Sequence, residues 1–456
     1  MFKNGKTRTM ALCLLLGAAL TMVVGIGTQR YCSAGGSDYE SIELFTDVLS
    51  IVKKSYVEEV DTKKLIYGAI NGMLSSLDPH SSFMPPESYK EMKIDTKGQF
   101  GGLGIEISIK EGMLTVISPI EDTPAFKAGI KAGDLILKID DKYTKDLSIG
   151  EAVKRMRGTK GTKVTLSIMR EGFEKPKEFP LVRDVIQVKS VKYKTLDDGY
   201  AYVRIAQFQE KTDDDLIKAL NALRAENGGA LKGLVLDVRN DPGGLLDQAV
   251  RVAEHFIPQG ELIVYTEGRE KESKVRYTSR KGTKEPSYPI VVLINSGSAS
   301  ASEIVAGALQ DHKRGIVMGT QSFGKGSVQS LIELSDNTGL RLTTARYYTP
   351  SGRSIQAKGI TPDIAVDRLE LNETAEKKDS MHIREKDLEN HFEDKQKDKS
   401  KDKEKDKEKD KDKDSTKEKL PLYKTDEQVK NDYQILRALD LLKGWEILKQ
   451  VMKTTS

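Results

Sequence analysis

The chain has 456 residues and a net charge of +4, with 38% hydrophobic and 31% charged residues. This length allows two or three domains, and so small a net charge argues against nucleic acid as a partner. The share of charged residues is high for a single globular body, so we expect part of the chain to be a solvated segment outside the folded domains.

The N-terminus combines three basic residues with an uncharged run from Ala11 to Thr28. This pattern is typical of a signal peptide or a single membrane anchor rather than of a core helix. Eighteen residues are near the lower limit for a spanning helix but exceed the apolar run of most signal peptides, so we expect residues 1–36 to be an anchor. A signal peptide cleaved after Ala34, which would release the protein, is the alternative. Because the basic end stays in the cytoplasm, the rest of the chain is expected to be extracytoplasmic.

The only two cysteines are Cys13 and Cys32. The chain beyond them therefore has no disulfide, no thiol nucleophile and no thiolate metal site. We expect no metal and no cofactor.

Three regions with different periodicities follow the N-terminal segment. Residues 37–93 read as helices, because apolar residues recur at helical spacing up to a proline-containing turn. Residues 94–183 read as short strands around two helices, which suits a compact binding domain. Residues 184–370 alternate apolar strands with amphipathic helices, which predicts an α/β fold.

The C-terminal part combines a charged stretch with one more helix. Residues 371–420 form a low-complexity linker, in which Lys395–Lys419 contains 12 lysines and 9 acidic residues and no apolar residue. Such a stretch cannot bury enough surface to fold, so we interpret it as a flexible tether, with binding to an anionic polymer as the alternative. Residues 421–456 should form a helix that returns to the core through Leu436, Leu439, Leu442 and Trp445.

A glycine-flanked lysine, Lys325, lies in the sequence GTQSFGKGSVQ. The spacing resembles a phosphate-binding loop, but Gly326 replaces the hydroxyl residue that would contact magnesium. The residues that follow are strand formers with a turn at Asp336–Gly339, and they predict a β-hairpin instead of a helix. A nucleotide-binding loop is therefore excluded.

A serine-rich turn provides a candidate nucleophile. Ser300 lies between an apolar strand and a helix, where free backbone N–H groups can stabilise an oxyanion. The sequence Ser300-Ala-Ser-Glu303 also matches a capping box, so a purely structural role for Ser300 is the competing interpretation. None of the five histidines has the sequence context of a catalytic partner. A lysine whose pKa is lowered by burial can serve as the base instead.

Several motifs together carry a family resemblance. They are LDPHSSFM, GLGIEI, LVLDVRNDPGGLL, GSASASEIVAGALQDHKRGIVMGTQSFGKGSVQ and YYTPSGRSIQAKGITPD. In this order they resemble the carboxyl-terminal processing (tail-specific) proteases, from about residue 40 to 368 and again in the C-terminal helix. The resemblance implies an extracytoplasmic serine endopeptidase with a crotonase-like α/β core, an inserted PDZ domain at 94–183, and helical N- and C-terminal segments. The insertion from about Glu373 to Lys419 departs from the common core.

The resemblance also assigns roles to individual residues. Ser300 corresponds to the nucleophile, Lys325 to the base and Gln329 to the residue that orients the lysine. The oxyanion hole is formed by the N–H of Ala301 with that of Gly243 or Gly244. Substrates are proteins or peptides with a free C-terminus, whose carboxylate the PDZ domain binds at Gly102, Leu103, Gly104 and Ile105.

Two interpretations from different classes remain. One is a Ser/Lys endopeptidase that forms a possible homodimer or higher oligomer through its helical segments. The other is a catalytically silent PDZ adaptor on the same fold. The intact set of Ser300, Lys325 and Gln329 favours the peptidase.

Overall fold

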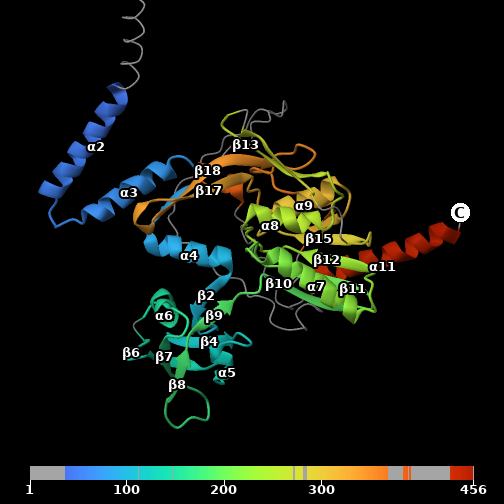
Figure 1. Cartoon of the computed structure of the whole chain (residues 1–456), viewed down its shortest axis with the longest axis horizontal. Coiled ribbons are helices and arrows are strands. Elements are labelled where there is room, and N and C mark those ends of the chain that lie inside the picture. Colours follow the sequence, from blue (N-terminus) through green and yellow to red (C-terminus); the bar gives the residue numbers. More distant parts are fainter. Residues whose placement is uncertain are drawn as a thin grey trace, which may run out of the picture. The chain divides into compact units, whose positions relative to one another are not determined.

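The computed structural model describes residues 36–110, 112–145, 147–270, 273–280, 285–367, 384–388, 390–391 and 432–454 (Figure 1). These residues fall into two units that divide after Leu74. The first unit holds helix α2 (Gly36–Ser55) and nearly all of α3 (Thr62–Ser75). Apolar side chains of α2, among them Ile42 and Ile51, are exposed.

The predicted membrane anchor at residues 1–36 lies almost entirely outside the described residues. Within the described part of the chain, no helix is both long enough and apolar enough to span a membrane.

The second unit begins with a short strand and a helix and continues into the predicted PDZ domain. A ribbon of β2 (Gln99–Gly102) and β9 (Asp184–Gln187) connects this domain to the rest of the unit. The domain itself has a sheet in the order β3-β4-β5-β7-β8, with β6 on β5. Its bounds are β3 (Ile105–Lys110), β4 (Met113–Pro119), α5 (Pro124–Lys127), β5 (Leu135–Ile139), β6 (Lys142–Tyr143), α6 (Ile149–Met156), β7 (Lys163–Met169) and β8 (Lys177–Val182).

The remaining part of this unit is the α/β core. Its six-stranded sheet has the order β10-β11-β12-β15-β16-β19 and is parallel except for the pair of β10 with β11. The strands are β10 (Val191–Asp197), β11 (Tyr200–Ile205), β12 (Gly233–Asp237), β15 (Ile290–Ile294), β16 (Ile316–Gly319) and β19 (Ile364–Ala365). The helices are α7 (Thr212–Glu226), α8 (Leu246–Glu254) and α9 (Ala301–Asp311).

A second, antiparallel sheet completes the core. It has the order β1-β18-β13-β14, with β17 also paired to β18. Strand β17 pairs with residues 339–346 of β18 and forms with them the hairpin that the sequence predicts after Lys325. The bounds of this sheet and of the neighbouring helical elements are β1 (Ser82–Met84), α4 (Pro86–Lys97), β13 (Leu262–Gly268), β14 (Val275–Thr278), β17 (Ser327–Glu333), η2 (Ser335–Asn337) and β18 (Gly339–Tyr348).

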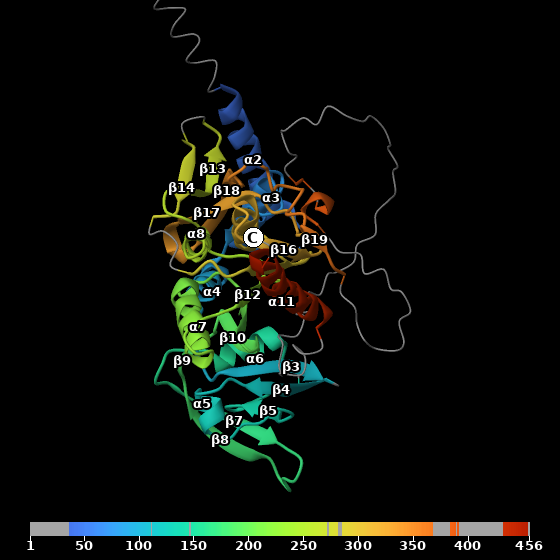
Figure 2. The same ribbon diagram turned by 90° about the vertical axis from the view of Figure 1, so that its right-hand side faces the viewer.

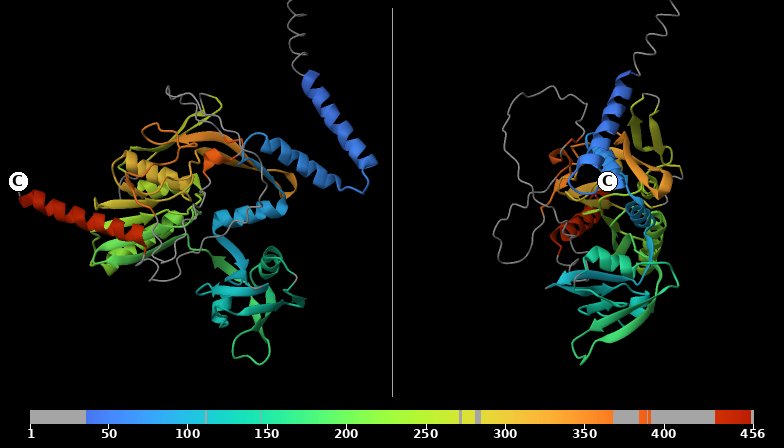
Figure 3. Two further views of the ribbon diagram at one scale, coloured as in Figure 1. Left: turned by 180° about the vertical axis from the view of Figure 1, so that it is seen from behind. Right: turned by 90° about the vertical axis from the view of Figure 1, so that its left-hand side faces the viewer.

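Both faces of the six-stranded sheet are buried, which explains its continuous apolar strands. On β12, Leu234 and Leu236 belong to the large core formed with α7–α9, whereas Val235 faces helix α11 (Tyr433–Thr454). The C-terminal helix therefore does return to the core, and Figures 2 and 3 show it beside the sheet.

The face with which α11 packs differs from the one that the sequence predicts. Ile435, Ala438 and Leu442 are buried, whereas Leu436 and Trp445 are 40% and 44% exposed. The prediction was wrong at these two positions because several helical faces of this segment are apolar, and spacing alone does not choose among them.

Candidate active site

Ser300 occupies the tight turn between β15 and α9. Its backbone has φ 57° and ψ −114°, a conformation that is strained for a residue with a side chain and is characteristic of functional sites. Its N–H donates to Glu303 Oε2 at 2.8 Å, so the carboxylate half of the predicted capping box is formed. The turn leaves Ser300 partly exposed at the N-terminus of α9.

The two neighbouring serines have structural roles. The Ser298 hydroxyl donates to the Val238 carbonyl at 2.7 Å, and the Ser302 hydroxyl donates to the Asp241 carbonyl at 3.0 Å. Both side chains are fully buried. Ser300 is therefore the only one of the three serines that is accessible to a substrate.

The loop of residues 240–244, which we name the oxyanion loop after the role that the sequence predicts for it, follows β12 and touches the serine turn. A Cβ atom on Gly243 would lie 2.7 Å from Ser300 Cβ and 2.9 Å from the Ala301 nitrogen, so only glycine fits there. Gly244, at φ 144°, likewise has no room for a Cβ beside the Phe208 carbonyl.

Some backbone N–H groups of this region donate a hydrogen bond within the protein, and others do not. The Gly243 N–H donates to Asp241 Oδ1 at 2.8 Å. Within the described part of the chain, the N–H groups of Ala301 and Gly244 have no hydrogen-bond partner. Of the two glycines that the sequence offers for an oxyanion hole, this geometry favours Gly244.

Lys325 lies in the lysine loop, residues 323–326, between β16 and β17. Burial lowers the pKa of Lys325, and the charge of Arg341 lowers it further. Glu385, Glu303 and Asp78 oppose this shift. Among the residues that the structure describes, none forms a hydrogen bond or an ion pair with Lys325 Nζ. These are conditions under which a lysine can lose its proton.

Glu303 joins the serine turn to the lysine loop. Its Oε2 accepts the N–H of Ser300 at 2.8 Å and that of Lys325 at 2.9 Å. Its Oε1 accepts the Ser322 hydroxyl at 2.6 Å and the Gly324 N–H at 2.8 Å. Burial raises the pKa of Glu303 to about 7, and these four hydrogen bonds oppose the rise. The sequence suggested only a helix cap at Glu303, but the structure makes it the centre of the site.

Gln329 lies on β17, four residues beyond Lys325. Its Nε2 donates to Ser327 Oγ at 2.9 Å and to Thr343 Oγ1 at 3.4 Å. Within the described residues Gln329 forms no hydrogen bond with Lys325 Nζ, so its orienting role stays a prediction.

Two further residues beside the site were not identified from the sequence. Tyr347 on β18 is fully buried, and burial together with the Glu303 charge raises the pKa of its hydroxyl well above the ordinary value. Asp241 is also fully buried, which raises the pKa of its carboxyl group, and its Oδ2 has no hydrogen-bond partner among the described atoms. Both residues lie within motifs of the family resemblance, YYTPSGRSIQAKGITPD and LVLDVRNDPGGLL, but the resemblance assigned a role to neither.

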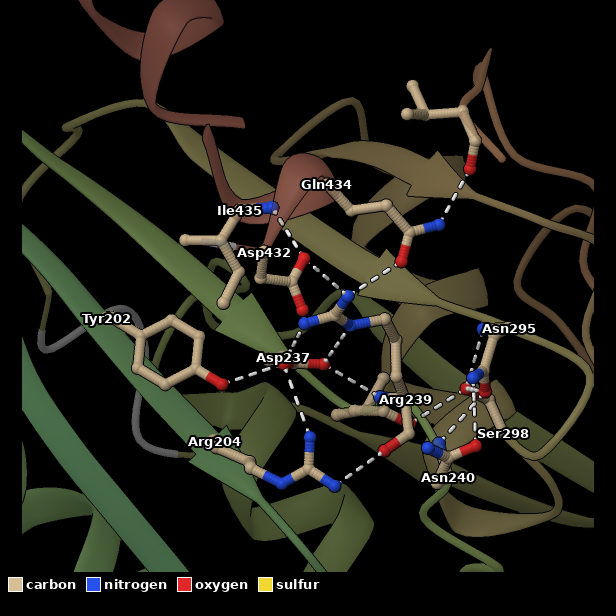
Figure 4. A network of polar contacts seen from close by, with 12 residues as sticks. Tyr202, Arg204, Asp237, Arg239, Asn240, Asn295, Ser298, Asp432, Gln434 and Ile435 are labelled. Atoms are coloured by element: carbon tan, nitrogen blue, oxygen red, sulfur yellow. Dashed lines mark hydrogen bonds and ion pairs between the residues drawn. The ribbon is translucent and has the colours of Figure 1, made fainter. Parts of the chain in front are cut away.

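A buried network of ion pairs and hydrogen bonds lies next to the oxyanion loop (Figure 4). Asp237, at the end of β12, pairs with Arg239 at 2.7 Å and with Arg204 at 3.3 Å. Although burial raises the pKa of Asp237, the Arg239 charge and hydrogen bonds lower it to about 2. Arg239 Nη1 also donates to Asp432 at 3.0 Å and to Gln434 at 2.6 Å, at the start of α11. The C-terminal helix is thereby fastened next to the oxyanion loop.

Replacing Arg239 with alanine should lower the free energy of unfolding by about 3–5 kcal/mol, because it leaves the buried charge of Asp237 under-compensated. Urea unfolding followed by tryptophan fluorescence measures this change. Asp432→Asn is the matched control and should cost much less, since Arg239 keeps its pairing with Asp237. Equal losses for the two variants would contradict this account of the network.

Comparison with known proteins defines the class of the chain. The model of peptidase family S41 matches residues 199–366, the PDZ domain model matches residues 101–179, and the model named Activating protease CtpB N-terminal domain matches residues 26–88. The chain is thus a serine peptidase of family S41 with a PDZ domain, and the predicted α/β fold with an inserted PDZ domain is confirmed.

Individual relatives narrow this assignment. The carboxy-terminal-processing protease of Bartonella bacilliformis is 53% identical over 331 residues, which cover 72% of this chain and 76% of the relative. The carboxyl-terminal-processing protease of Synechocystis sp. is 39% identical over 327 residues, covering 70% and 75%. The solved photosystem II D1 C-terminal processing protease is 30% identical, covering 71% of this chain and 92% of that one, with a TM-score of 0.42. The chain belongs to the carboxy-terminal processing proteases, as the sequence motifs predict.

Proposed function

We propose that this peptidase hydrolyses exported proteins with a Ser300/Lys325 dyad. One observation carries the proposal: the backbone N–H groups of Ser300 and Lys325 both donate to Glu303 Oε2. This common acceptor holds the backbones of the serine and the lysine side by side. The free N–H groups of Ala301 and Gly244 lie in the same turn region and supply the donors of an oxyanion hole.

The chemistry follows from these positions. Neutral Lys325 Nζ accepts the Ser300 hydroxyl proton while Oγ attacks the scissile carbonyl carbon. The N–H groups of Ala301 and Gly244 stabilise the resulting oxyanion. The lysine then gives its proton to the leaving amine, and the acyl-enzyme remains on Ser300. A water molecule, deprotonated by Lys325, hydrolyses this ester and restores the enzyme. We assign Gln329 the role of orienting the lysine, without adding a charge that would keep it protonated.

A fluorophosphonate probe, which reacts with activated serines, tests this proposal directly. Wild-type protein should be labelled at Ser300, as located by mass spectrometry of the labelled peptide, and Lys325→Ala should be labelled far more slowly. A catalytically silent adaptor would bind peptides but remain unlabelled, and that outcome would overturn the proposal.

The PDZ domain is proposed to select substrates by their C-terminus. Strand β3 is the edge strand of its sheet, and α6 packs beside it. Because β3 pairs with β4 on one side, a peptide can add to its other side as a further strand. The turn before β3 contains Gly104 at φ 76°, where a Cβ would collide with Thr123. Backbone N–H groups of Gly102–Ile105 would hold the terminal carboxylate.

Amidating the C-terminus of a substrate peptide should therefore weaken its binding by roughly tenfold, because charge-assisted hydrogen bonds to the carboxylate are lost. Fluorescence anisotropy with labelled peptides on the Ser300→Ala protein measures the dissociation constant without cleavage. A free-acid peptide with a scrambled internal sequence is the control. Equal affinity of the amidated and free-acid forms would count against C-terminal recognition.

We also propose that the peptidase is extracytoplasmic and held at the membrane by its N-terminal segment, which the basic residues before the uncharged run support. We further propose that its helical segments pair subunits, which the exposed apolar side chains of α2 support. Protease accessibility in spheroplasts tests the location, and sedimentation equilibrium tests the assembly.

A further inference from the structure

A short piece of the charged insertion reaches the active site. Residues 384–388, which we name the insertion clamp, contain the single turn η3 (Glu385–Asp387). The sequence assigned these residues to the linker 371–420, yet the side chain of Glu385 is 0% exposed. Its backbone N–H donates to the carbonyl of Phe323 in the lysine loop at 3.2 Å.

The Glu385 carboxylate is hydrogen-bonded on both oxygens. His80 Nε2 lies 2.7 Å from Oε1 and 2.8 Å from Oε2. Gln356 Nε2 donates to Oε1 at 2.9 Å. Gln356 Oε1 in turn accepts the N–H of Gly326 at 2.9 Å, immediately after the catalytic lysine. Glu385 thus reaches both ends of the lysine loop.

The lysine loop is consequently held by two buried glutamates. Glu303 accepts the N–H groups of Gly324 and Lys325 in the middle of the loop. The insertion clamp binds the ends, at Phe323 through the backbone and at Gly326 through Gln356. A loop with two glycines has much backbone freedom to lose, so these bonds decide where its lysine points.

The charges that face Lys325 come from four elements. Arg341 on β18 disfavours the protonated lysine, and Glu303 on α9, Glu385 in η3 and Asp78 before β1 favour it. His80 contacts Glu385 directly, and Tyr347 on β18 is a buried titratable group that senses the charges of Glu303 and Glu385. Replacing Glu385 by a neutral residue removes one of the three anions.

We propose that Glu385 is a positioning residue of the peptidase reaction, which fixes the lysine loop through Gln356 and through its own backbone. The proposal rests on the proposed role of Lys325 as the base. It makes Glu385 part of the active-site structure, although Glu385 lies within an insertion of low complexity.

Steady-state cleavage of a peptide by full-length variants tests the proposal. Glu385→Ala should lower kcat about 10- to 100-fold with little change in KM, because the base is displaced while the substrate contacts remain. Glu385→Gln keeps an acceptor oxygen for Gln356 and should retain kcat within a few-fold. Because it removes an anion that favours the protonated lysine, the acidic limb of its pH–kcat profile should move to lower pH.

Asp387→Asn is the matched control, since it also removes one carboxylate from the insertion clamp but at an exposed position. It should change neither kcat nor the pH profile. If Glu385→Ala does not fold, the pH–kcat profile of Glu385→Gln tests the proposal by itself. An unmoved acidic limb in Glu385→Gln, or a wild-type kcat in folded Glu385→Ala, would overturn the proposal. Wild-type activity in Lys325→Ala would instead refute the proposed function itself.

The neighbouring charged tract should be dispensable for the reaction. Deleting Lys395–Lys419, which has no apolar residue, should leave kcat within a few-fold of the wild-type value. Replacing residues 384–388 by glycine and serine at constant length should reproduce the loss seen in Glu385→Ala. Equal activity of these two proteins would contradict a special role of the insertion clamp.

Discussion

Replacing Ser300 with alanine is expected to lower kcat for peptide cleavage by about 10⁵- to 10⁶-fold, the scale of loss when a serine nucleophile is removed. The Oγ atom is the only group of the serine turn positioned to form the acyl-enzyme, since the neighbouring hydroxyls are buried and bonded to carbonyls. Peptide affinity should be unchanged, because the PDZ domain is untouched. Quenched-fluorescence assays over several hours measure the residual rate.

Two neighbouring substitutions separate this prediction from the capping interpretation. Ser298→Ala and Ser302→Ala should retain kcat within a few-fold, although each loses a buried hydrogen bond and therefore some stability. If Ser300 served only as a helix cap, Ser300→Ala would cost about 1 kcal/mol of stability and leave cleavage intact. Activity in Ser300→Ala near that of the wild type would end the dyad hypothesis.

Replacing Lys325 with alanine should be almost as severe, with a loss in kcat of at least about 10⁴-fold. Lys325→Arg is the informative companion variant, because arginine keeps the positive charge but cannot act as a base at any ordinary pH. We expect both variants to be inactive. Full activity in Lys325→Arg would show that the site needs a cation rather than a base.

The same lysine predicts how activity and stability depend on pH. Only neutral Lys325 accepts a proton, so wild-type kcat should fall as the pH drops through its lowered pKa. Because that pKa lies below the unfolded value of 10.5, the unfolded chain binds more protons in this interval. The contribution of Lys325 to the free energy of unfolding therefore rises with pH until about 10.5. Lys325→Met, which carries no buried charge, should lose this slope in urea titrations at different pH values.

Local patterns in the sequence predicted the secondary structure around the candidate site. A serine between an apolar strand and a helix indicated Ser300, and strand formers after Lys325 indicated the β17–β18 hairpin, which the structure contains. In both cases the signal lies within a few residues of the feature, so periodicity and turn chemistry capture it.

The residues that were missed act over long sequence distances. Glu303 matches a helix cap locally, and nothing near it reveals that its carboxylate also binds the backbone of Lys325, 22 residues further on. Glu385 lies in a region whose composition indicates a solvated linker, and its partner His80 is 305 residues away. Such pairs follow from how the chain packs, which a single sequence does not encode in any local pattern.

The attachment of α11 beside the oxyanion loop has a consequence for the timing of activity. Arg239 depends for two of its hydrogen bonds on Asp432 and Gln434, about 20 residues from the C-terminus. A chain whose synthesis has not yet reached α11 can already contain both Ser300 and Lys325 but still lack this support. A chain truncated by a premature stop codon or clipped in the linker therefore keeps both residues of the proposed dyad but loses two of the hydrogen bonds that hold Arg239 beside the oxyanion loop.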